Sequence, residues 1–295
     1  MTVLIQQVVD GLSRGGTYAL LALGLAVIFG IMRLLNFAHG ELITVTAYAM
    51  FFLLLTGTGW WAVVPLALVA AVVAAVGTER VAFRRVRGAD VFTMLLTSFG
   101  LGIIIQALFR MYVSPTPQQF ERPEWIFSRV SVLGVSLELY SLVVIAVTAV
   151  VLLGTAWLIQ RTTFGVMTRA AAEDFDAARL MGVRADRVIV GVFSLAGLLA
   201  GVAGVLLLIR SGTASPALGI TPLLKGLVAA IVGGLGSLGG AVAAGLLLGV
   251  SEVLVRSLLP GHLEGLTDGV IFAMIAVLFT VRPQGLFDVV HAERV

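Results

Sequence analysis

The sequence predicts an all-α membrane protein, built as a bundle of helices that each cross the bilayer. Of its 295 residues, 59% are hydrophobic and only 12% are charged, which is about half the charged fraction of a soluble domain. Because this small number of charged residues cannot cover a water-facing surface, lipid has to surround most of the exterior of the protein. Only helices and closed barrels satisfy their backbone in lipid, and the apolar stretches have the length of spanning helices, about 20 residues, rather than that of barrel strands.

Nine apolar stretches are the candidate spans. They cover residues 12–31, 40–56, 60–78, 91–111, 139–159, 188–209, 222–236, 238–258 and 266–281. The seventh stretch is short, and only the glycine-rich turn around 236–239 separates it from the eighth. Either of these two can be a broken or re-entrant element, so the prediction is eight to ten spans in a single transmembrane domain that covers residues 1–295.

Basic residues in two loops predict the orientation of the spans. The segments 79–90 and 160–187 hold many of the chain's 19 Lys and Arg residues, and such residues concentrate in cytoplasmic loops. Two spans separate these segments, as a shared side of the membrane requires. The loop 112–138 then lies outside. The same scheme places the N-terminus outside and the C-terminus inside.

The second basic loop contains a predicted surface helix over residues 168–181. Glu173 and Asp174 lie toward its start and Arg179 toward its end, an arrangement that the helix dipole favours. Gly182 follows as the left-handed residue at which helices commonly end. A short capped helix on the cytoplasmic face can insert into the groove of a partner protein. A solvated linker is the alternative.

This loop resembles the cytoplasmic coupling loop of ABC-importer permeases, in the form found in LivH-type permeases of branched-chain amino acid importers. Four other stretches resemble the same family in the same order along the chain. They are 18–25 (YALLALGL), 36–41 (NFAHGE), 233–240 (GGLGSLGG) and 282–287 (RPQGLF). The resemblance covers nearly the whole chain, and the second and fourth stretches are its most specific parts.

The resemblance implies a permease subunit that moves branched-chain or related amino acids inward across the bacterial cytoplasmic (inner) membrane. It implies partners as well: a second, LivM-like permease, two cytoplasmic ATPase subunits that hold ATP and Mg, and an external substrate-binding protein. Whether the permease pair is a heterodimer or a homodimer stays open. Relatives that carry urea, amides or other small solutes are one alternative. An ion-coupled secondary transporter is the alternative from another class, and nucleic acid is not an expected partner.

Two groups of residues are the candidate functional residues. Those predicted to couple the permease to the ATPases are Arg169, Ala172, Glu173, Asp174, Phe175, Ala178, Leu180, Met181 and Gly182. Polar residues in or beside spans are costly and often mark pathways. Those predicted to line or gate a pathway, with one neighbouring aromatic residue, are Asn36, Phe37, His39, Glu41, Thr44, Thr97 and Gln106. For the turn at 36–41, a helix cap or a hydrogen-bonded turn is the structural alternative.

The sequence shows no pattern of an enzyme. Its three histidines are far apart in the chain, unlike a metal-ligand set, and the glycine-rich stretch 233–240 lacks the Gly-Lys-Ser/Thr of a P-loop. We therefore expect no catalytic residue, no metal and no ATP site on this chain. Glu252 and Asp268 lie in or beside spans. They are either a proton or ion site, or ion-pair partners of Arg256 or Lys225, and the second interpretation is favoured.

Overall fold

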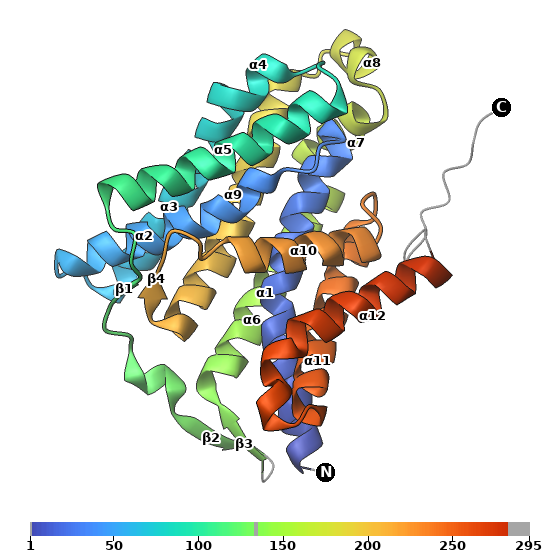
Figure 1. The fold of residues 1–295 in the computed structure, drawn as a ribbon. Helices are drawn as coiled ribbons and strands as arrows, with labels where there is room; N and C mark the ends of the chain where they lie inside the picture. Colours follow the sequence, from blue (N-terminus) through green and yellow to red (C-terminus); the bar gives the residue numbers. More distant parts are fainter. Residues whose placement is uncertain (1, 133–134, 283–295) are drawn as a thin grey trace. The chain divides into compact units, whose positions relative to one another are not determined.

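The computed structural model describes residues 2–132 and 135–282, which are helical almost throughout (Figure 1). Within these residues, eight helical segments are long and apolar enough to cross a membrane. They are formed by α1 (Thr2–Met32), η1 with α2 (Phe37–Gly40 and Glu41–Leu55), α3 (Trp60–Thr78) with the helical turns that continue it to Val86, α5 (Val91–Tyr112), α6 (Leu139–Arg161), α9 (Ala185–Ser211), α11 (Leu238–Leu258) and η4 with α12 (Gly261–Leu266 and Thr267–Val281). The predicted fold class, a polytopic helical bundle, is confirmed.

Shorter elements connect these helices. The helical ones are η2 (Glu79–Phe83, a π-helical turn), α4 (Arg84–Val86), η3 (Glu124–Phe127), α7 (Thr163–Glu173), α8 (Phe175–Leu180), α10 (Ile220–Val232) and η4 (Gly261–Leu266). Two antiparallel strand pairs, which the sequence analysis did not predict, are β1 (Gln118–Gln119) with β4 (Thr213–Ala214) and β2 (Arg129–Val132) with β3 (Val135–Glu138).

The predicted spans agree closely with the observed helices, apart from the first and the seventh. The predictions 60–78 and 238–258 coincide with α3 and α11. Helix α1 begins at Thr2, well before the predicted residue 12, because polar residues such as Asp10 lower the hydropathy of its first turns without breaking the helix. The seventh predicted span is only the 13-residue α10. The predicted motif at 282–287 lies outside the described residues except for its first residue.

The chain forms two compact units. The first unit contains residues 1–26, 124–149 and 225–295, and the second contains residues 27–123 and 150–224. Helices α1, α6 and α10 each contribute residues to both units.

In the second unit, α3 packs closely against α9 through small residues. A Cβ atom added at Gly201 would lie 2.9 Å from the Cβ of Ala71, and one added at Gly197 would lie 3.0 Å from the Ala71 carbonyl oxygen and close to Ala75. Lipid offers no hydrophobic drive for helix association, so close backbone approach has to supply packing energy. Gly197 and Gly201, one helical turn apart, therefore serve as close-packing positions of α9.

In the first unit, α1 packs against α11 in the same manner. A Cβ atom at Gly245 would lie 2.6 Å from the Cα of Ala19, and one at Gly11 would lie 2.7 Å from the Cα of Val250. Residues later in α1 contact residues earlier in α11, so the two helices are antiparallel.

These packing directions test the order of the crossings. With one crossing for each of the eight segments, α11 would be the seventh span and would run parallel to α1. The observed antiparallel packing requires a further crossing between α1 and α11, and the short helix α10, which directly precedes α11, is the candidate for it. A 13-residue helix is about 20 Å long, shorter than the roughly 30 Å hydrocarbon core. We therefore infer that residues 212–237 form a broken span. Which side of the membrane each end faces stays a prediction.

Candidate functional site

The predicted pathway residues gather, with one exception, at the turn between α1 and α2 in the second unit. Asn36 caps the 3-10 turn η1, because its side chain accepts a hydrogen bond of 3.0 Å from the backbone N–H of Ala38. Asn36, His39, Gly40 and Glu41 are all buried. Asn36 therefore has the structural role that was considered as an alternative, and the turn presents His39 and Glu41 to the protein interior.

One face of α5 covers this turn. The Ser98 hydroxyl accepts a hydrogen bond of 3.2 Å from the backbone N–H of Phe37. One turn further on, Gly102 faces Glu41, since a Cβ atom added at Gly102 would lie in ordinary contact, 3.8 Å from the Glu41 Cγ. The Gln106 amide then donates a hydrogen bond of 2.6 Å to Glu41 Oε1. The residues of α5 are spaced at helical intervals, so they form one face.

Helix α2 presents a polar stripe beside this face. Glu41, Thr44 and Tyr48 are at positions i, i+3 and i+7, so they share one side of the helix, and all three are buried. Tyr48 stacks on Phe109 of α5 with ring centroids 4.4 Å apart. Because the contacts advance along both helices together, α2 and α5 run parallel, as spans two crossings apart must.

Several polar atoms of this stripe and of the adjoining turn have no hydrogen-bond partner among the described residues. They are Glu41 Oε2, Thr44 Oγ1, Tyr48 OH and both ring nitrogens of His39. Leaving a buried polar group unsatisfied costs about 1–3 kcal/mol, and folded proteins avoid it. The stripe therefore weakens the closed bundle, which favours a functional role over a purely structural one.

The structure does not bring Thr97 to this turn. Its hydroxyl donates a hydrogen bond of 2.7 Å to the carbonyl of Thr93, within its own helix. Conversely, Tyr48 belongs to the polar stripe although it was not among the predicted pathway residues. The signal was present, because Tyr48 follows Glu41 and Thr44 at helical spacing inside an apolar span.

The predicted single surface helix over 168–181 is wrong, because the chain breaks at Asp174. Its backbone is extended (φ −150°, ψ 110°), and its side chain accepts hydrogen bonds from the backbone N–H groups of Asp176 and Ala177 at 3.0 and 2.9 Å. Aspartate competes with helical hydrogen bonding in this manner and is preferred as an N-cap. The loop therefore holds two helices, α7 and α8, and Asp174 begins the second one. The predicted left-handed stop at Gly182 is confirmed (φ 86°).

The predicted coupling residues divide into packed and exposed ones. Ala178 is buried, and Ala172 and Phe175 are half-buried. Arg169 donates a hydrogen bond to the carbonyl of Ile159 at the end of α6, so its guanidinium is anchored within the unit. The exposed ones are Glu173, Asp174, Leu180, Met181, Gly182 and, despite its hydrogen bond, Arg169. Leu180 and Met181 are apolar side chains with exposures of 90% and 86%.

A salt-bridge network, which was not predicted from the sequence, joins the end of α3 to the start of α9, the helix that follows α8 in the chain. Arg87 binds the buried Glu79 of the π-helical turn η2, and its other nitrogen lies 2.5 Å from Asp186 in the first turn of α9. Arg84 lies 3.5 Å from the same Asp186 carboxylate. The end of α3 is therefore tied to the start of α9, the helix that α8 precedes.

The first unit holds a second buried charge network. Glu252 of α11 binds Arg14 at 3.0 Å through one oxygen and Lys225 at 2.9 Å through the other. Tyr18 donates a hydrogen bond of 2.7 Å to the same carboxylate, and Lys225 also lies 2.9 Å from Asp268. The favoured interpretation of both acids as ion-pair partners is confirmed for Lys225. Arg256, the other predicted partner, pairs with Glu264 instead.

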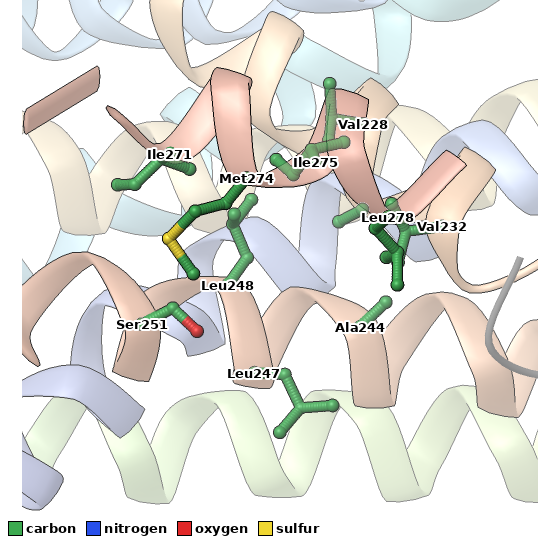
Figure 2. Close-up of a pocket in the computed structure, with 11 residues that line it drawn as sticks. Val228, Val232, Ala244, Leu247, Leu248, Ser251, Ile271, Met274, Ile275 and Leu278 are labelled. Carbon is green, nitrogen blue, oxygen red and sulfur yellow. The ribbon is translucent and has the colours of Figure 1, made fainter. Parts of the chain in front are cut away.

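A pocket of about 210 Å³ lies between α10, α11 and α12 of the first unit. Figure 2 shows its lining, in which Val228, Ile271 and Met274 stand among other apolar side chains and Ser251 is the polar exception. Such a lining offers no partner for a charged group. Within the described ranges, no three His, Asp or Glu side chains are placed to bind a metal ion.

The architecture and the site together define a multi-pass membrane protein with a polar stripe inside one of its units, the class to which solute permeases belong. The chain matches residues 7–279 to the family described as "Branched-chain amino acid transport system / permease component", so it belongs to that family. The resemblance found in the motifs is confirmed.

Relatives match along nearly the whole length. The chain is 32% identical to the high-affinity branched-chain amino acid transport system permease protein BraD of Pseudomonas aeruginosa, over 99% of this chain and 98% of the relative. It is 33% identical to LivH of Escherichia coli K12, which carries the same description, over 99% and 97%. It is 29% identical to the probable LivH of Methanocaldococcus jannaschii, over 92% and 88%. The chain is a membrane-spanning permease subunit of a transport system.

Proposed function

We propose that this chain is the permease subunit of an ABC importer that moves branched-chain amino acids inward, and that its whole length acts as one transmembrane domain. The observation that carries the proposal is the full-length similarity to BraD and LivH, both named for high-affinity branched-chain amino acid transport. The proposed location is the cytoplasmic membrane of a bacterium. The proposed partners are a LivM-like permease, two cytoplasmic ATPases that hold ATP and Mg, and an external substrate-binding protein.

The energy for transport comes from the partner ATPases in this proposal. The glycine-rich turn at 233–240 has no lysine and follows a helix rather than a strand, so it lacks the parts with which a P-loop holds phosphates. In this proposal the permease leaves ATP hydrolysis to its partners and converts nucleotide-driven motion into opening and closing of a path.

Helix α8 makes the proposed contact with the ATPases. Its apolar end, Leu180 and Met181, is exposed, and an exposed apolar pair on a capped loop fits a hydrophobic groove on a partner. Gly182 ends the helix, and α9 begins three residues later at Ala185. A displacement of α8 therefore reaches α9 through a short link, and the salt bridges of Arg87 pass it on to α3.

The proposed path runs along the polar stripe of α2 and the facing side of α5. Its members are Phe37, His39, Glu41, Thr44 and Gln106 from the predicted set, with Tyr48 added. Separation of α5 from α2 would hydrate the unpartnered polar atoms of the stripe and so lower the cost of opening. Asn36 holds the turn in shape.

Purification of the tagged subunit with its partners tests the proposal. The expected result is co-purification of ATPases whose activity rises when the binding protein is loaded with leucine, isoleucine or valine, but not with urea or an amide. A subunit that is extracted without ATPases, or a complex stimulated only by urea or amides, would refute the amino-acid importer.

A further inference from the structure

Three carboxylates are buried among the described residues: Glu41, Glu79 and Glu252, with exposures of 2%, 0% and 5%. Glu79 is paired with Arg87, and Glu252 is paired with Lys225 among others. Glu41 is the exception, because no Lys, Arg or His of the described ranges lies within salt-bridge distance of it. A carboxylate inside an apolar span is costly unless positive charge compensates it.

The surroundings of Glu41 provide only part of this compensation. Gln106 donates to one oxygen, Oε1. The exposed Arg110, one turn further along α5, attracts the carboxylate from a distance but forms no salt bridge with it. Oε2 is buried and accepts no hydrogen bond. Among the described residues, the Glu41 carboxylate therefore has no cation that pairs with it.

Two more oxygen acceptors lie on the same side of α2. The Thr44 hydroxyl is close enough to the Glu41 carboxylate to act on it as a donor, although not at full hydrogen-bond geometry, and Tyr48 follows one turn later. Neither hydroxyl oxygen accepts a hydrogen bond, and both residues are buried. A carboxylate oxygen and two hydroxyl oxygens on one face are acceptors of the kind that the three N–H donors of an alkylammonium group require.

We propose that Glu41 is the counter-charge for the α-ammonium group of the amino acid as it passes through the permease, with Thr44 and Tyr48 as further acceptors. The proposal rests on the proposed transport of amino acids. The three oxygens are buried in this structure, so the ammonium group reaches them when α5 moves away from α2. Gln106 keeps Oε1 occupied and turns Oε2 toward the ligand.

The test uses the complete complex in proteoliposomes, with leucine uptake and vanadate-trapped, occluded leucine as readouts. Glu41→Gln keeps the size of the side chain and its bond to Gln106 but removes the charge. We expect uptake and occlusion to fall at least about tenfold, the effect of one charged hydrogen bond, while the complex still assembles with its ATPases. Glu41→Asp should retain part of the uptake. The double variant Glu41→Gln/Gln106→Glu, which moves the carboxylate across a 2.6 Å contact, should recover part of it.

Glu264→Gln is the matched control, because it makes the same chemical change in a carboxylate that is half-exposed, and it should transport normally. Leucine uptake at the wild-type rate by Glu41→Gln would overturn the proposal. Leucine uptake that depends on sodium in the wild type and loses this dependence in Glu41→Gln would also overturn it, since this result would assign the site to Na⁺. If the Glu41→Gln complex does not assemble, the Glu41→Asp variant and the Glu41→Gln/Gln106→Glu double variant provide the test. An assembled complex of either variant that takes up no leucine would overturn the proposal. A wild-type complex that moves no amino acid would refute the proposed function instead.

Discussion

Replacement of Lys225 by methionine should destabilise the first unit by about 2 kcal/mol. The side chain of Lys225 is only 8% exposed and lies 2.9 Å from both Glu252 and Asp268. Loss of a charged hydrogen bond to the buried Glu252 costs about 1.5–3 kcal/mol. Glu252 keeps Arg14 and Tyr18, so the roughly 3–5 kcal/mol expected for a fully orphaned buried charge is not reached. Asp268 is half-exposed, so its pair adds little.

The assay for this prediction is equilibrium unfolding in mixed detergent and SDS micelles, followed by helical circular dichroism. Arg256→Met is the matched control, because it removes a basic partner from an ion pair whose side chains are both about half-exposed and 3.4 Å apart. Its cost should be below about 1 kcal/mol. A Lys225→Met variant that loses no more stability than the control would refute the assignment of Lys225 to a buried, stabilising network.

Three further predictions test packing, coupling and topology. Gly245→Val should destabilise the α1–α11 contact by about 3 kcal/mol or more in the same unfolding assay, because its Cβ would lie 2.6 Å from the Cα of Ala19. Gly154→Val is the control and should be nearly neutral, because open space surrounds Gly154. Equal losses of stability in the two variants would contradict the packing argument. Leu180→Asp should reduce ATPase co-purification at least tenfold while membrane insertion stays normal, and retention of the ATPases would exclude α8 as the docking helix. A cysteine in place of Arg85 should react only with reagents on the cytoplasmic side, and labelling from outside would overturn the predicted orientation.

Hydropathy alone predicted most of the fold, because each span in lipid has to satisfy its own backbone and therefore follows from a local apolar stretch. The seventh stretch was correctly marked as an unusual element from its short length, and the structure has the short helix α10 there. The strand pair between Gln118–Gln119 and Thr213–Ala214 could not be predicted, because four polar or small residues far apart in the chain carry no local strand pattern.

The helix break at Asp174 was missed for a different reason. Residues 168–181 have good helix propensity on average, but the cap formed by Asp174 with the N–H groups of Asp176 and Ala177 outweighs it. Propensity is a weak prior that a specific hydrogen bond overrides.

The candidate site was predicted in part. The turn at 36–41 and Gln106 were selected as polar residues in apolar surroundings, and the structure joins Glu41 to Gln106 at 2.6 Å. What the sequence could not predict is which buried acid lacks a cation. Lys225 and Glu252 are 27 residues apart and Arg87 and Asp186 are 99 apart, so only the tertiary packing assigns these partners and leaves Glu41 without one.

Uptake of radiolabelled leucine into proteoliposomes tests whether this chain is an importer permease driven by its partners. The vesicles hold the assembled complex with ATP on the ATPase side and the loaded binding protein on the other. Leucine accumulation should require both ATP and the binding protein, and it should stop when ATP is replaced by a non-hydrolysable analogue. Accumulation driven by an ion gradient in the absence of ATP would contradict this expectation.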